Sequence, residues 1–118
     1  MHERRDDMNA TVSLTELAET ELASAVASNN GRSAVTVRGG RDSQLRQTVM
    51  ALRAGEGLDE HSSPGEATLQ VLVGRVTLRS GDQSWAGVAG DLLPIPDTVH
   101  ALDALEDSVI LLTVAKAH

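Results

Sequence analysis

The chain has 118 residues, of which 41% are hydrophobic, and it contains no cysteine. This length predicts one domain with a single core, and the lack of cysteine excludes a disulfide, a catalytic thiol and a thiolate metal site. Ten basic residues against seventeen acidic ones give a formal net charge of −7, which argues against nucleic acid and against an anionic membrane surface as partners.

The apolar residues are dispersed along the chain, and no apolar run approaches the ~20 residues that a membrane span requires. No cationic start followed by an apolar stretch marks a secretory signal, so we expect a cytoplasmic protein. Phe and Tyr are absent and Trp85 is the single tryptophan. The walls of any pocket are therefore expected to be aliphatic, polar or His side chains.

A helix is predicted over residues 13–30, after a segment, residues 1–12, that we expect to be disordered or flexible. Ser13 and Glu16 match a capping box at its start, and Asn-Asn-Gly at 29–31 is typical of a helix end. Apolar residues recur on one face at helical spacing: Leu14, Leu17, Ala18, Leu22, Ala25 and Val26. Such a face requires cover, and we expect it to pack on its own domain or on a twin subunit.

From residue 31 to residue 118 the pattern changes from helical spacing to the two-residue alternation of strands. Short runs rich in Val, Thr and Leu lie between Gly-rich turn segments, at 34–38, 45–53, 68–73, 76–79, 84–86, 92–95, 100–105 and 109–114. No helical segment separates them, which predicts an antiparallel sandwich or barrel in one domain of residues 31–118.

Two segments carry the candidate chemistry. In the first, GEGLDEHSSPGEATLQVLVG, Gly55 and His61 are separated by five residues; in the second, GDLLPIPDTVH, Gly90 is followed by Pro96 and His100. Here the sequence resembles the cupin superfamily of small double-stranded β-helix (jelly-roll) proteins. The family's first motif is Gly, five residues, His-x-His, three or four residues, Glu, six residues and Gly, and its second is Gly, five residues, Pro-x-Gly, two residues and His. The resemblance implies an all-β cupin barrel, preceded here by the N-terminal amphipathic helix.

The match to these motifs is partial. The family's second His position falls on Ser63, and its Glu position falls on Ala67, with Glu66 one residue earlier. The family's metal site uses three His and one Glu, so the resemblance leaves His61 and His100 as candidate ligands, with Glu66 as a further one. A carboxylate displaced by one position along a strand points to the opposite face, unless the preceding Pro-Gly bend re-aims it. Two imidazoles alone leave most of the metal coordination to water.

The resemblance also implies a pocket inside the barrel, lined by His61, Ser63, Ala67, Leu69, Val71 and His100. One hypothesis is a module that binds or senses a small molecule, with His61 and His100 offering hydrogen bonds at its polar end. A sensor of this size would act on transcription only through another protein. The alternative is a metal-dependent enzyme of the dioxygenase, isomerase or decarboxylase type, in which the two His side chains bind one Zn, Fe, Mn or Ni ion.

The sequence leaves open whether a divalent metal is bound or none, and whether the protein is an enzyme. The resemblance further implies a homodimer, which agrees with the tendency of open sheet edges to be covered.

Overall fold

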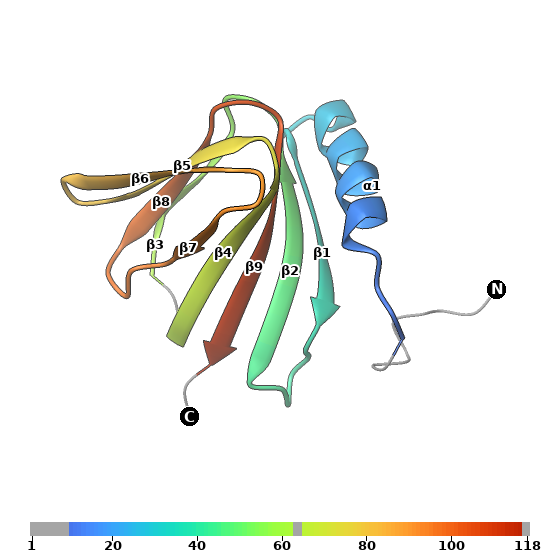
Figure 1. Cartoon of the computed structure of the whole chain (residues 1–118), viewed down its shortest axis with the longest axis horizontal. Coiled ribbons are helices and arrows are strands. Elements are labelled where there is room, and N and C mark those ends of the chain that lie inside the picture. Colours follow the sequence, from blue (N-terminus) through green and yellow to red (C-terminus); the bar gives the residue numbers. More distant parts are fainter. Residues whose placement is uncertain (1–9, 63–64, 117–118) are drawn as a thin grey trace.

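The computed structural model describes residues 10–62 and 65–116, which form one helix and nine strands (Figure 1). In chain order these are α1 (Leu14–Ala27), β1 (Arg32–Arg38), β2 (Leu45–Leu52), β3 (Gly57–His61), β4 (Gly65–Val73), β5 (Arg75–Ser80), β6 (Gln83–Val88), β7 (Leu92–Pro94), β8 (His100–Ala104) and β9 (Ser108–Lys116). No helix in the described part of the chain is long and apolar enough to cross a membrane.

The strands form two sheets in which all neighbouring strands are antiparallel. The five-stranded sheet has the order β1-β2-β9-β4-β7 and the four-stranded sheet has the order β3-β8-β5-β6. Apolar residues of both sheets meet between them in one core: Leu52, Leu69, Val71, Val76, Leu78, Leu93, Leu102, Ala104 and Ile110. The predicted all-β jelly roll with an N-terminal helix is thus confirmed.

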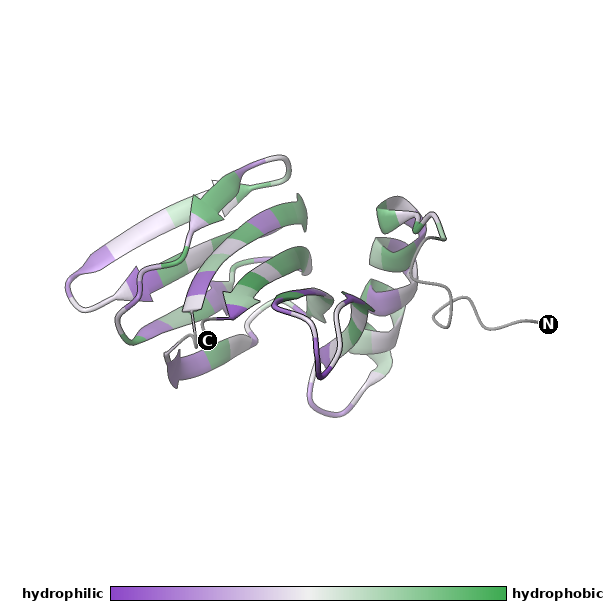
Figure 2. Cartoon of the chain, turned by 90° about the horizontal axis from the view of Figure 1, so that it is seen from below, coloured by the Kyte–Doolittle hydropathy of each residue, from purple (hydrophilic) through white to green (hydrophobic). Residues whose placement is uncertain are grey.

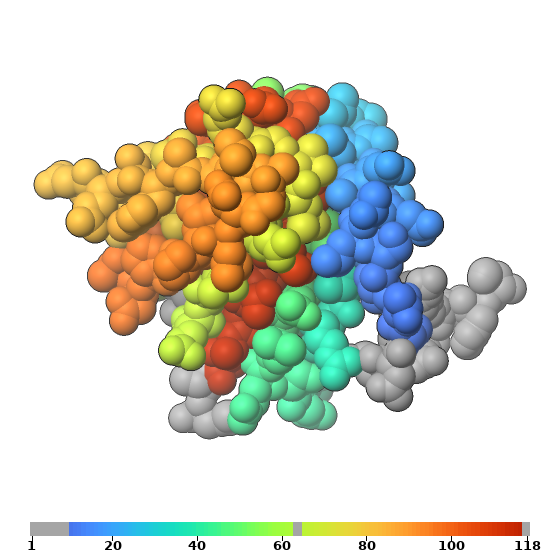
Figure 3. Space-filling model, in the orientation of Figure 1, coloured from blue at the N-terminus to red at the C-terminus, as the bar shows by residue number. Residues whose placement is uncertain are grey.

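The helix packs on the outer face of the five-stranded sheet. Ala18 and Ala25 are buried against a second apolar cluster, to which the sheet contributes Val49, Ala51, Val109 and Leu111. Figure 2 shows α1 beside the strands, and Figure 3 shows it as one flank of the molecule. The predicted amphipathic face is therefore covered by the chain's own domain.

The start of the helix carries a local signal that the sequence contains. The Ser13 hydroxyl accepts a hydrogen bond from the Glu16 N–H at 3.1 Å, as predicted for the N-cap. Val26, by contrast, is 45% exposed, although it belongs to the predicted stripe. Because each four-residue step turns the helix about 40° beyond a full circle, Val26 has rotated out of the face on which Leu14 lies.

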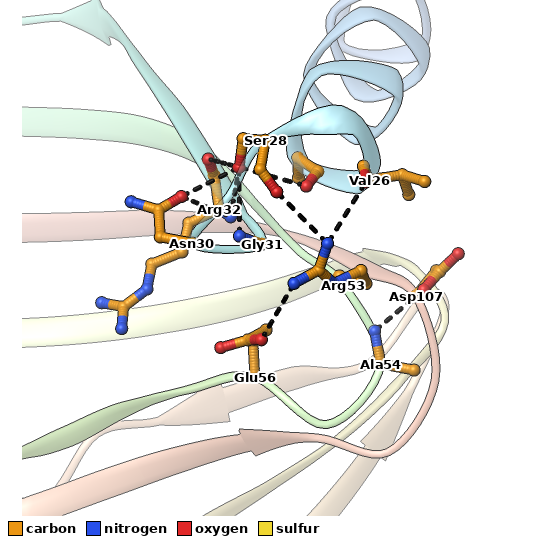
Figure 4. A network of polar contacts seen from close by, with 10 residues as sticks. Val26, Ser28, Asn30, Gly31, Arg32, Arg53, Ala54, Glu56 and Asp107 are labelled. Atoms are coloured by element: carbon orange, nitrogen blue, oxygen red, sulfur yellow. Dashed lines mark hydrogen bonds and ion pairs between the residues drawn. The ribbon is translucent and has the colours of Figure 1, made fainter.

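Arg53, in the turn after β2, ties the end of α1 to the barrel (Figure 4). Its Nη1 donates to the carbonyls of Val26 and Ser28, at 3.3 and 3.2 Å. Its Nη2 pairs with the Glu56 carboxylate at 3.3 Å. A helix end has carbonyls without intrahelical partners, and the Arg53 guanidinium supplies donors to them.

The strand β3 was not predicted, because its sequence, GLDEH, has few residues that favour strands. Pairing with β8 supplies the backbone hydrogen bonds that hold it. A register irregularity between Leu58 and His61 ends with His61 directly opposite His100. The strand therefore positions one of the two candidate imidazoles.

Candidate functional site

A cavity of about 150 Å³ lies between the two sheets. Its walls are mainly aliphatic and come from strands of both sheets and from the segment after β7: Leu58, Leu69, Leu78, Ile95, Leu102, Ile110, Leu112 and Val114. The remaining lining residues are His61, Ser62 and His100. The cavity is therefore apolar with one polar end.

The two imidazoles lie against each other at that polar end. Their ring centroids are 4.6 Å apart and the ring planes are inclined by 64°, an edge-to-face contact. His100 is only 3% exposed, whereas His61 is exposed. His100 thus belongs to the buried wall, and His61 stands between the cavity and solvent.

Both rings are oriented by the same local hydrogen bond. The Nδ1 atom of His61 lies 2.8 Å from the Asp59 carbonyl oxygen, and the Nδ1 atom of His100 lies 2.8 Å from the Thr98 carbonyl oxygen. A carbonyl only accepts, so Nδ1 carries the proton in each ring and Nε2 of the neutral imidazole presents a lone pair. Nε2 is therefore the nitrogen of each ring that this backbone hydrogen bond leaves available.

Of the residues assigned to the pocket from the sequence, the structure brings His61, Leu69 and His100 to one cavity. Ala67 and Val71 are buried on the same face of β4 as Leu69 but do not line the cavity. Ser63 lies outside the described residues, and its neighbour Ser62 lines the cavity.

Sequence reasoning missed most of the cavity wall. The alternation of Ile110, Leu112 and Val114 along β9 was a usable signal, because alternate residues of a strand share a face. The contributions of Leu78 and Leu102 depend on how the sheets face each other, and no local pattern in the sequence shows this.

Glu66 does not join the two imidazoles. On β4 it alternates with Ala67 and Leu69, which face the interior, so its side chain is on the outer face and is exposed. Within residues 10–62 and 65–116, no three His, Cys, Asp or Glu side chains come close enough to hold a metal ion. A resident divalent metal takes four or more ligands, mostly from the protein, so the described residues do not fit one.

Charged groups of the four-stranded sheet lie on its outer face. Arg79 donates from Nε to the Asp103 carboxylate at 2.5 Å. This hydrogen bond and the negative charge of Asp103 raise the pKa of the Arg79 guanidinium, with a smaller contribution from Glu60. Because the adjacent residues Leu78 and Leu102 line the cavity, these charges point away from it.

Two antiparallel sheets closed over an apolar cavity with a polar end define a small double-stranded β-helix domain. No protein-family model matches the sequence, and no curated protein matches it. Solved structures do match. A conserved protein of unknown function from Streptococcus pyogenes is 27% identical, with a TM-score of 0.68 over 77% of this chain and 79% of that chain.

A cupin superfamily protein from Desulfitobacterium hafniense is 19% identical, with a TM-score of 0.75 over 92% of this chain and 93% of that chain. Salicylate 1,2-dioxygenase from Pseudoaminobacter salicylatoxidans is 17% identical, with a TM-score of 0.70 over 93% of this chain but only 36% of that chain. Further matches are also cupins. The chain has the fold of a small cupin domain.

Proposed function

We propose that this cupin domain binds a small, mainly aliphatic molecule between its sheets and orients it through His61 and His100, without a resident metal. The observation that carries the proposal is that the two imidazoles, each held through Nδ1 by a backbone carbonyl, lie in contact and line the same apolar cavity. Pockets that bind small molecules combine apolar walls with a few convergent polar groups in this way.

The size of the cavity limits the ligand. Cavities of about 150 Å³ in other proteins admit a molecule the size of benzene, roughly six heavy atoms. No aromatic side chain other than the two imidazoles lines the walls, so branched or cyclic aliphatic groups fit as well as flat rings.

The polar end selects the functional group of the ligand. A buried acceptor that loses contact with water requires a donor in exchange, and an unmet one costs about 1–3 kcal/mol. The two Nε2 lone pairs therefore favour a ligand with a hydroxyl or amide N–H at one end.

The test compares 4-methylpentan-1-ol with its methyl ether by isothermal titration calorimetry. The two have similar apolar groups, but the ether cannot donate a hydrogen bond. We expect the alcohol to bind about tenfold more tightly, and this difference to disappear in His61→Leu and His100→Leu. Gln70→Leu, on the outer face of β4, is the control and keeps the difference. Equal affinity for both probes, or no binding of either, would overturn the proposal.

A metal-dependent enzyme is the second candidate, in which His61 and His100 would supply two imidazole ligands and water or substrate would complete the coordination, since the described residues offer no third ligand. Elemental analysis of protein purified without chelator separates the two candidates. About one metal ion per chain, lost in both His61→Ala and His100→Ala, would establish the enzyme candidate in place of the metal-free one. A metal content near zero supports the binding domain.

We further propose that two chains associate through the edge formed by β6 and β7, which are the last strands of their sheets. Large apolar side chains are exposed there: Trp85 by 40%, Val88 by 45% and Leu92 by 65%. An apolar sheet edge favours pairing with another chain. Light scattering after gel filtration should give twice the chain mass of 12.4 kDa. Trp85→Lys should give the mass of the monomer, whereas Leu105→Lys, at an exposed turn, should keep the mass of the dimer. A monomer mass for the wild-type chain would refute the dimer.

A further inference from the structure

The inner face of the five-stranded sheet carries two cations at the polar end of the cavity. Arg46 on β2 is paired with Val114 on β9, in an unbroken register that also pairs Met50 with Ile110. Directly opposed residues of antiparallel strands project to the same face, with Cβ atoms about 4.5–5.5 Å apart. Because Val114 and Ile110 line the cavity, the Arg46 side chain stands beside the cavity wall.

Lys116 occupies the next inward position of β9. It follows Val114 by two residues, and its partner on β4 is Gly65. The glycine has no side chain that could cover the ammonium group. The end of β9, the start of β2 and the start of β4 lie at the same end of the barrel (Figure 1).

No carboxylate neutralises these cations within residues 10–62 and 65–116. The three ion pairs found there join Arg53 to Glu56, Arg75 to Glu106 and Arg79 to Asp103. Glu66 is on the outer face of β4, as shown above, and Glu60 acts on Arg79 at the outer face of the other sheet. In a chain with a net charge of −7, two cations that lie beside an apolar cavity, and that no carboxylate of the described residues pairs with, require an explanation.

We propose that Arg46 and Lys116 bind the carboxylate of the ligand, so that the domain is specific for small aliphatic carboxylates. This inference rests on the proposed function of the same cavity. The apolar group enters between the sheets, and the carboxylate stays at the open end against the inner face of β2 and β9. The imidazoles on β3 and β8, in the opposite sheet, bind a donor group of the ligand or a water molecule.

The test measures the affinities of 4-methylpentanoate and of 5-methylhexan-2-one, a ketone of the same shape that has neither the charge nor a hydrogen-bond donor. Hydrogen bonds to charged groups are stronger than neutral ones, so the wild-type chain should prefer the carboxylate by at least about tenfold. Arg46→Met and Lys116→Met should each lower this preference severalfold, and the double variant should abolish it. Arg32→Met removes the same charge at the other end of the barrel and should keep the preference.

Equal affinity of the wild type for the carboxylate and the ketone overturns the inference, and so does a preference that survives both substitutions. The proposed function is tested separately by the binding of 4-methylpentan-1-ol. If the alcohol binds while the carboxylate has no advantage, the inference fails and the proposed function stands. If neither alcohol nor carboxylate binds, both fail.

Discussion

A double-mutant cycle at His61 and His100 tests whether the two imidazoles meet as the structure shows. His100→Ala removes a buried ring, its hydrogen bond to the Thr98 carbonyl and its contact with His61. The hydrogen bond contributes about 0.5–1.5 kcal/mol and an edge-to-face ring contact about 0.5–1.5 kcal/mol. With the lost burial of the ring, the free energy of unfolding should fall by about 2–4 kcal/mol.

His61→Ala should cost less, about 1–2 kcal/mol, because the exposed ring loses one hydrogen bond and the same ring contact. The ring contact is counted in both single variants but lost only once in the double variant. The double variant should therefore be more stable than the sum of the single changes predicts, by about 0.5–1.5 kcal/mol.

Urea unfolding at one fixed protein concentration gives these free energies, with Trp85 as the only tryptophan reporter. A coupling below about 0.3 kcal/mol would mean that the two sites are independent. The rings would then not be in contact, and the shared cavity end would be refuted.

Two further predictions concern the scaffold. Arg53→Met should lower the free energy of unfolding by about 1 kcal/mol, since its guanidinium is partly exposed. The melting temperature measured by circular dichroism should fall by roughly 4 °C. Arg32→Met should change neither quantity, and equal effects of the two substitutions would contradict the contact between Arg53 and the helix end in Figure 4. Gly74→Ala should cost about 3–4 kcal/mol, because φ is +90° and a Cβ atom would overlap the Ser108 hydroxyl oxygen. At Gly81, φ is +59° and a Cβ atom would meet no other atom within 4 Å, so Gly81→Ala should lower the free energy of unfolding, measured with urea, by only about 1–2 kcal/mol. A larger loss for Gly81→Ala than for Gly74→Ala would contradict the close contact at Gly74.

The strands and the helix start were predictable because their signals are local. Alternation marked β2 and β9, and the spacing of Ser13 and Glu16 marked the N-cap. The strand β3 was missed because Asp59 and Glu60 do not favour strands, and its pairing with β8 is a contact between distant segments.

The candidate site was only partly predictable, for a related reason. The resemblance to the cupin motifs identified both His residues as candidates, although His100 is one residue nearer to Pro96 than in the family's second motif. Local spacing could not show that the register irregularity in β3 sets His61 opposite His100. The position of Arg46 beside Val114 likewise follows from the pairing of β2 with β9, and no motif marks it.

The convergence of two imidazole Nε2 atoms on one ligand site is measured most directly by nuclear magnetic resonance of the ring nitrogens. In the ¹⁵N-labelled protein at alkaline pH, both rings should show a proton on Nδ1 and a lone pair on Nε2. Addition of 4-methylpentan-1-ol should shift both Nε2 resonances with one common dissociation constant, while the Nδ1 resonances move less. If only one Nε2 responds, or neither does, the two side chains do not share a binding site.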